Sequence, residues 1–188
     1  MPNLYIISGC NGAGKTTASY SVLPEMLACK EFVNADEIAK GLSPFHPDGV
    51  AIEAGRIMLQ RIDELMNKGA DFAIETTLAT KSYVKLIDEA HAKSYFVTLI
   101  YFWLNTPDLA VERVKERVKL GGHHIPEDVI RRRYIAGARN LKSLFIPVCD
   151  YWILIDNSVP PFKFVAEGNR LNSIEIKDEI IYTQILNI

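Results

Sequence analysis

The chain has 188 residues and a formal net charge of −2, so no overall field attracts nucleic acid or an anionic membrane. Its 48% apolar and 23% charged residues are typical of an ordinary globular protein with a sizeable core. The three cysteines are odd in number and far apart, which argues against a disulfide framework, fits a reducing compartment and predicts a cytoplasmic protein. The segment MPNLYIISG is expected to be a first strand and not a signal peptide.

Apolar runs and helical patterns alternate along the chain. We predict strands at residues 3–8, 31–36, 71–75, 95–104 and 151–156. We predict helices at residues 15–27, 50–68, 82–94, 106–120 and 127–145. Pro24 is expected to end or kink the first of them. In the second of these helices the expected buried stripe is Ile52, Ile57, Leu59, Ile62 and Leu65, with Gly69 as its C-terminal cap. Thr106 and Pro107 are expected to start the fourth helix.

The stretch GCNGAGKTT, residues 9–17, follows the first predicted strand and fills the pattern GxxxxGK[ST]. Glycines let such a loop curl until several backbone N–H groups point into one concavity, and the positive end of the next helix dipole adds to them. The lysine reaches the β- and γ-phosphates, and the threonine hydroxyl holds Mg²⁺. We therefore predict ATP and Mg²⁺ as cofactors, with Mg²⁺ on Thr16. The predicted nucleotide-binding residues of the loop are Gly9, Asn11, Gly12, Ala13, Gly14, Lys15, Thr16 and Thr17.

With this loop between a strand and a helix, the alternation predicts a P-loop NTPase three-layer α/β fold. The sheet is expected to be mainly parallel and five-stranded, with helices on both faces. At about 160–178, FKFVAEGNRLNSIEIKD alternates apolar and polar residues around a turn, which predicts a small C-terminal β-hairpin. We expect a single domain over residues 1–188, with a helical lid region at about 113–140.

Two carboxylates follow predicted strands, and parallel strands all end at the edge of the sheet where ligands bind. Asp36 could accept the proton of an attacking hydroxyl; the alternative is that it caps a helix beginning at Glu37. Glu75, Thr76 and Thr77 suit a polyhydroxylated acceptor, so we assign Asp36 and these three residues to the substrate. Glu75 could equally bind Mg²⁺ through water, and a structural role is the third alternative.

Arginines cluster in the predicted lid region around the glycine break GGHH. They are Arg113, Arg117, Arg131, Arg132, Arg133 and Arg139. Closing a glycine-hinged lid would bring guanidinium groups onto a transferring phosphate, so we predict catalytic roles for Arg113, Arg132 and Arg133. Arg117 is assigned to the nucleotide. The alternative is a solvated basic helix face paired with nearby glutamates.

Four segments, in this order, resemble the zeta-toxin-like family of P-loop kinases, and its short single-domain bacterial members most. They are GCNGAGKTT, VNADEIAKGLSP, AIETTLAT and GGHHIPEDVIRRRYIAGARNL. Zeta toxins phosphorylate UDP-N-acetylglucosamine at the sugar 3′-hydroxyl, using ATP and Mg²⁺. The resemblance implies a kinase domain and suggests an antitoxin-type protein as a partner.

The resemblance also implies roles for single residues. Asp36 corresponds to the catalytic base of the family, and Glu75 to a glutamate that helps to hold the substrate. Arg113, within VERV, corresponds to an arginine of the helix after the fourth strand. The later arginines do not follow the zeta pattern, so Arg132 and Arg133 are candidates by their chemistry alone.

Together these observations predict an ATP-dependent P-loop kinase that acts on a hydroxyl of a small molecule, such as a nucleotide sugar. Lys15 would bind the transferring phosphate and Asp36 would be the base. One alternative is a polynucleotide kinase, which the acidic net charge disfavours. The other is a nucleotide-dependent binding module or ATPase without an acceptor. No membrane partner is expected.

Overall fold

In the computed structural model, which describes residues 1–171 and 173–188, the described strands form one seven-stranded sheet in the order β2-β3-β1-β4-β5-β6-β7. The strands are β1 (Asn3–Gly9), β2 (Glu31–Val33), β3 (Phe72–Thr76), β4 (Phe96–Trp103), β5 (Tyr151–Asp156), β6 (Lys163–Asn169) and β7 (Ile174–Ile176). β1 to β5 pair in parallel, and β6 and β7 pair antiparallel. The five parallel strands are those that the sequence predicts.

The predicted hairpin is present but is not a separate appendage, so the sheet is mixed and larger than five strands. β6 pairs with the edge of β5, with Gly168 opposite Trp152. The Trp152 ring lies where a side chain at Gly168 would have to go, so this pairing requires a glycine. The turn was predicted at Gly168, Asn169 and Arg170, but β6 continues to Asn169; residue 172 of the hairpin lies outside the described residues.

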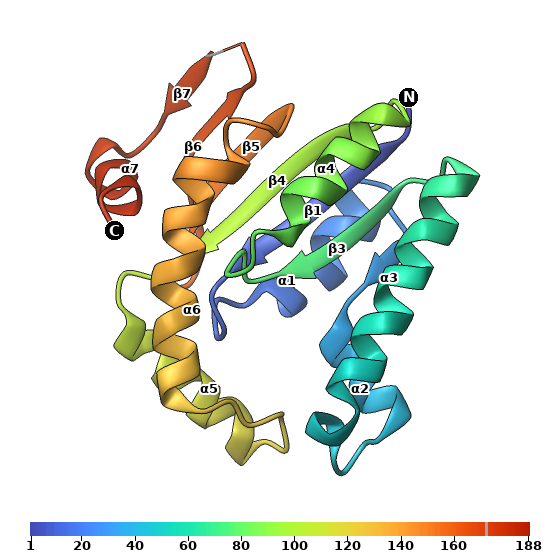
Figure 1. The fold of residues 1–188 in the computed structure, drawn as a ribbon. Coiled ribbons are helices and arrows are strands. Elements are labelled where there is room, and N and C mark those ends of the chain that lie inside the picture. Colours follow the sequence, from blue (N-terminus) through green and yellow to red (C-terminus); the bar gives the residue numbers. More distant parts are fainter. Residues whose placement is uncertain (172) are drawn as a thin grey trace.

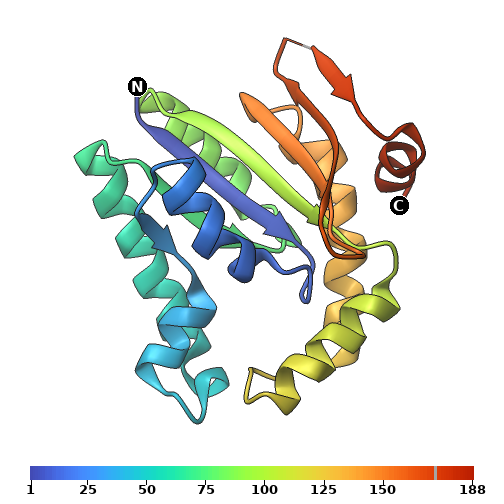
Figure 2. The ribbon, with the colours of Figure 1, turned by 180° about the vertical axis from the view of Figure 1, so that it is seen from behind.

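Helices cover both faces of the sheet (Figures 1 and 2). They are α1 (Lys15–Ser21), α2 (Ala35–Leu42), α3 (Ala51–Lys68), α4 (Ser82–Ala92), α5 (Pro107–Lys119), α6 (Glu127–Asn140) and α7 (Glu179–Leu186). Short 3₁₀ and π segments are Pro47–Val50, Val22–Met26 and Leu141–Phe145. Leu4 and Ile6 of β1 join the core formed with α3, α4 and α7, whereas Ile7 joins the core formed with α5. Alternate side chains of β1 therefore enter the cores on opposite faces of the sheet, which gives a layer of helices on each side.

Three local predictions are wrong. The second strand ends at Val33 because α2 begins at Ala35. The α-helix predicted over 127–145 ends at Asn140, and a π-helical segment begins at Leu141, whereas the break expected at Pro24 is present as the π-helical segment Val22–Met26. In α3, Ile52, Ile57 and Leu59 are exposed, and the residues buried against the sheet are Ala54, Met58, Ile62, Leu65 and Met66.

The parallel strands bring their carboxyl ends to one edge of the sheet. Ser8 of β1 lies opposite Thr76 of β3, and Gly9 lies opposite Phe102 of β4. The glycine loop, the start of α2 and the end of β3 therefore meet at this edge. No helix in the described part of the chain is long and apolar enough to cross a membrane.

Candidate active site

The glycine loop between β1 and α1 depends on glycine at defined positions. Gly9 has φ 137° and Gly14 has φ 81°, which are left-handed conformations that other residues rarely adopt. A Cβ at Gly9 would overlap the backbone oxygen of Phe102, and one at Gly14 would lie 2.6 Å from Nδ2 of Asn157. The Asn157 amide also donates to the backbone oxygen of Ala13 at 2.8 Å. Phe102 of β4 and Asn157, which directly follows β5, thus pack against the loop in its curled form.

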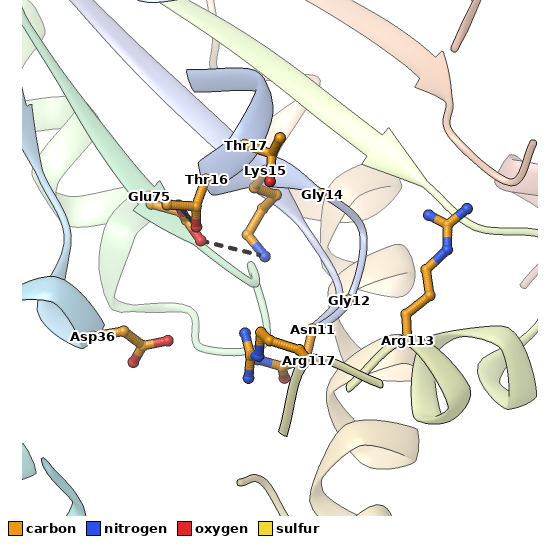
Figure 3. Close-up of a pocket in the computed structure, with 10 residues that line it drawn as sticks. All are labelled: Asn11, Gly12, Gly14, Lys15, Thr16, Thr17, Asp36, Glu75, Arg113 and Arg117. Carbon is orange, nitrogen blue, oxygen red and sulfur yellow. Dashed lines mark hydrogen bonds and ion pairs between the residues drawn. The ribbon is translucent and has the colours of Figure 1, made fainter. Parts of the chain in front are cut away.

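The Glu75 carboxylate contacts polar side chains at the end of the glycine loop and just before α2 (Figure 3). Glu75, at the end of β3, accepts from Oγ1 of Thr16 at 2.8 Å and from Nδ2 of Asn34 at 2.9 Å. Nζ of Lys15 lies 3.6 Å from the other Glu75 oxygen and donates to the backbone oxygen of Cys10 at 3.0 Å. The side chains of Lys15 and Glu75 are only 6% and 11% exposed. Glu75, which is predicted to bind the substrate, is therefore in contact with Lys15 and Thr16, which are predicted to bind phosphate and Mg²⁺.

Asp36 lies on the first turn of α2 and is not its cap. Asn34 is the N-cap, and its Oδ1 accepts from the backbone N of Asp36 at 2.8 Å and of Glu37 at 3.4 Å. The alternative that Asp36 caps the helix is wrong, because Asn34 already satisfies these two N–H groups. The Asp36 side chain is exposed and faces the cavity from the side opposite the loop (Figure 3). Its carboxylate is therefore free to contact a ligand.

Two adjoining cavities lie at this edge, with volumes of about 240 and 210 Å³. The first cavity is lined by Asn11, Gly12, Gly14, Lys15, Thr16, Thr17, Asp36, Glu75, Arg113 and Arg117. The second cavity is lined by Asn11, Lys15, Asn34, Ala35, Asp36, Glu75, Thr76, Thr77, Ala79, Thr80, Tyr83 and Arg133. Both cavities share Asn11, Lys15, Asp36 and Glu75. A group moving from one cavity to the other would pass between these side chains.

Two arginines of α5 line the first cavity. Arg113 donates to the backbone oxygen of Ser158 at 2.9 Å, and its side chain points away from Lys15 (Figure 3). Arg117 donates to the backbone oxygen of His123 at 2.9 Å. The Nε atom of Arg117 is buried and has no hydrogen-bond partner within residues 1–171 and 173–188. An unpaired buried N–H is unfavourable, and because this atom is shielded it could contact a ligand only after the Arg117 side chain moves.

The arginines of α6 separate into different environments. Arg133 is partly buried, lines the second cavity and donates to Oδ1 of Asn11 at 3.3 Å. Arg132 and Arg139 are exposed, and neither is among the residues that line the two cavities. Arg131 lies on the solvent face and pairs with Asp108 at 2.6 Å and Glu127 at 2.8 Å. The structure thus brings Arg133 to the site and leaves Arg132 outside it.

The glycine break between α5 and α6 has a structural function. The N–H groups of Gly121 and Gly122 donate to Val118 and Arg117, so these glycines end α5. The loop that follows then reaches the opposite side of the site, where Nε2 of His123 lies 3.3 Å from the Asp48 carboxylate. Sequence reasoning did not assign a function to His123, Asn34 or Asn157.

The loop cysteine is chemically inert. Cys10 is buried, and burial raises the pKa of its thiol to about 11. The thiol therefore stays protonated at neutral pH, and no nucleophilic role follows from its place in the loop.

Solved structures of low sequence identity share this fold. A chain of the AvrRxo1-ORF1:ORF2 complex, solved with ATP, is 18% identical with a TM-score of 0.81, covering 99% of this chain and 64% of that chain. This chain thus spans less than two thirds of that protein. A chain from the PezAT toxin–antitoxin system of Streptococcus pneumoniae is also 18% identical, with a TM-score of 0.67, covering 89% of this chain and 72% of the other. Both similarities show the fold alone.

Two sequence comparisons concern the family. A Haemophilus influenzae protein described as uncharacterized is 32% identical over 127 residues, which is 67% of this chain and 88% of the relative. The family model named Zeta toxin matches residues 1–145, which include the glycine loop, Asp36, Glu75 and the arginines of α5 and α6. This chain therefore belongs to the zeta toxin family.

Proposed function

We propose that the protein is an ATP-dependent P-loop kinase that transfers the γ-phosphate of ATP to a hydroxyl group of a small molecule. One observation carries the proposal: the cavity at the glycine loop and the cavity beside it share Lys15 and Asp36. ATP in the first cavity and an acceptor in the second would meet at these two side chains. We further propose that residues 1–188 form one kinase domain, with a lid over residues 113–140.

Several groups of the first cavity suit a triphosphate. The loop N–H groups and the start of α1 would bind the phosphates, and Lys15 would leave Glu75 to reach the transferring phosphate. Arg117 lines this cavity, and after a movement of its side chain its unpaired Nε–H would bind a phosphate oxygen. Mg²⁺ is usually bound by one or two protein oxygens together with phosphates and water. Thr16 and Glu75, which are in contact at 2.8 Å, fit this requirement. Thr16 would bind Mg²⁺ directly, and Glu75 would bind it through a water molecule. The metal would neutralise charge on the phosphates.

The transfer itself needs few protein groups. The acceptor oxygen forms a bond to the γ-phosphorus, the bond to the β-phosphate oxygen breaks and ADP leaves. Asp36 would take the proton of the acceptor hydroxyl, because its carboxylate is free and lines both cavities. Arg113 would stabilise the transition state after leaving the backbone oxygen of Ser158.

The family suggests a first acceptor and a first partner. Zeta toxins act on nucleotide sugars, so UDP-N-acetylglucosamine is the first acceptor to test. The structures of similar fold come from a complex named AvrRxo1-ORF1:ORF2 and from a toxin–antitoxin system. An antitoxin-type protein is accordingly the partner that we propose.

A screen of ATP consumption tests the proposal. The purified protein would be incubated with Mg·ATP and, separately, with nucleotide sugars, sugars, nucleosides and oligonucleotides. We expect one small-molecule class to accelerate ADP formation, and Lys15→Ala to abolish that acceleration. Acceleration by oligonucleotides alone would identify a polynucleotide kinase. ADP formation that no acceptor changes would contradict the kinase proposal and favour a slow ATPase.

A further inference from the structure

One face of α6 is fixed against the wall of the second cavity. Arg133, Gly137 and Asn140 lie at positions i, i+4 and i+7 and so share this face. A side chain at Gly137 would overlap the backbone oxygen of Thr77, so helix and loop are in direct backbone contact there. One turn further on, the Asn140 amide donates to the backbone oxygen of Leu78 at 2.7 Å. These two contacts fix the position of α6 along its axis and its rotation about that axis, and so they fix where Arg133 lies.

The charge of Arg133 is not neutralised by the protein. Its hydrogen-bond partner is the neutral amide oxygen of Asn11 at 3.3 Å, and within residues 1–171 and 173–188 no ion pair joins it to a carboxylate. Arg131, two residues earlier, shows the contrast, because it contacts two carboxylates on the solvent face. A partly buried guanidinium with spare N–H donors is suited to bind a planar anion through two hydrogen bonds.

The position of Arg133 distinguishes it from the arginines of α5. Arg113 and Arg117 line the first cavity and not the second, whereas Arg133 lines the second and not the first. Its helix is anchored to the end of β3 through Gly137, so Arg133 is held in place on the acceptor side of Lys15. This argues against the transition-state role that the sequence suggested for Arg133.

We propose that Arg133 is an acceptor-binding residue, and that it binds an anionic group of the acceptor, a phosphate or a carboxylate, while the reacting hydroxyl faces Asp36. This inference rests on the proposed kinase function and assigns a substrate-binding residue of the same site. The second cavity, at about 210 Å³, exceeds the roughly 150 Å³ that holds one six-membered carbon ring. It is therefore larger than a single ring requires. Thr76, Thr77 and Thr80 supply side-chain hydroxyls along the same cavity.

A binding experiment separates this inference from the kinase proposal. The protein is first saturated with Mg²⁺ and the non-hydrolysable analogue AMP-PNP, whose binding is verified by calorimetry, so that the glycine loop is filled. Inorganic phosphate or acetate is then titrated while the Nε–Hε NMR signal of Arg133 is observed. We expect this signal to shift and saturate with at least one of the two anions. Arg133→Gln should weaken that binding about 10-fold or more, and Arg133→Lys should weaken it less.

Arg132→Gln is the matched control, because it removes one positive charge from the neighbouring exposed position of the same helix. It should leave anion affinity within about twofold. Equal anion binding to wild-type protein and to Arg133→Gln would overturn the inference, as would absence of anion binding to the AMP-PNP-saturated protein. Failure of AMP-PNP to bind would instead remove the kinase proposal, and with it this inference.

With an acceptor from the screen, steady-state kinetics give a second readout. Arg133→Gln should raise the KM of the acceptor about 10- to 100-fold and change the KM of ATP much less. A reduced kcat with an unchanged acceptor KM would place Arg133 on the transition state and contradict the inference. Exclusive use of uncharged acceptors would do so as well.

Discussion

Asparagine at position 36 removes a charge and a proton acceptor while leaving α2 nearly intact. Both cap bonds of this helix go to Asn34, so Asp36 stabilises it only as a negative charge in the first turn, by about 0.3–1 kcal/mol. In a chain of 188 residues, 1 kcal/mol corresponds to about 2–4 °C in Tm. We therefore expect Asp36→Asn to lower Tm by at most about 4 °C. Phosphate transfer should fall about 10²- to 10⁴-fold, the usual contribution of a positioned base.

Single-turnover transfer, Mg·ATP calorimetry and thermal melts measure these quantities on the same samples. Asn34→Ala is the matched control, because it removes the two cap bonds and the bond to Glu75 but no proton acceptor. It should lower the free energy of unfolding by about 0.5–2 kcal/mol, more than Asp36→Asn does. A fully active Asp36→Asn protein would refute the assignment of the base, and would either move that role to Glu75 or remove general-base catalysis from the mechanism.

Three further predictions concern the helix contacts, the metal and the loop thiol. Gly137→Ala should lower the free energy of unfolding by about 1–3 kcal/mol, because its Cβ would overlap the Thr77 backbone. Gly55→Ala in α3, with open space around it, should raise the free energy of unfolding by about 0.5–1 kcal/mol. Urea melts of both variants test this, and a stabilised Gly137→Ala would refute the contact. Glu75→Gln should raise the Mg²⁺ concentration for half-maximal transfer about 10-fold, and an unchanged Mg²⁺ dependence would exclude Glu75 from the metal. Cys10, whose thiol has a pKa of about 11, should resist iodoacetamide at pH 8 in the native protein and react after denaturation; rapid native labelling, followed by mass spectrometry, would contradict its burial.

The parts of the fold that depend on local sequence were predictable. β5 spans the predicted residues, and Thr106 caps α5 by accepting from the N–H of Leu109. The end of β2 was not, because it depends on whether the Asn34 side chain folds back onto the next turn. The pairing of the hairpin with β5 was missed for a different reason. It joins distant residues through the fit of Trp152 against Gly168, which no local pattern encodes.

The candidate site divides in the same way. The glycine loop has a motif, and Glu75 follows an apolar strand, so their meeting at one edge could be predicted. Three consecutive arginines, however, are about 100° apart on a helix, and sequence alone cannot say which one faces the cavity. The contact of Gly137 with Thr77 makes that choice, in favour of Arg133. Asn157 was identifiable from the sequence, because it comes directly after the predicted strand 151–156 at the same edge.

Transfer from ATP requires that a triphosphate bind in the loop around Lys15, and calorimetry of Mg·ATP binding to wild-type protein and Lys15→Ala measures this directly. Lys15 is buried and paired with Glu75, so native circular dichroism of the variant must be verified first. Wild-type protein should bind one Mg·ATP per chain, and Lys15→Ala should bind about 10- to 100-fold more weakly, since a charge-assisted bond to phosphate contributes roughly 1.5–3 kcal/mol. Equal affinity in a folded Lys15→Ala protein, or no binding to wild-type protein, would contradict the phosphate-binding role of the loop.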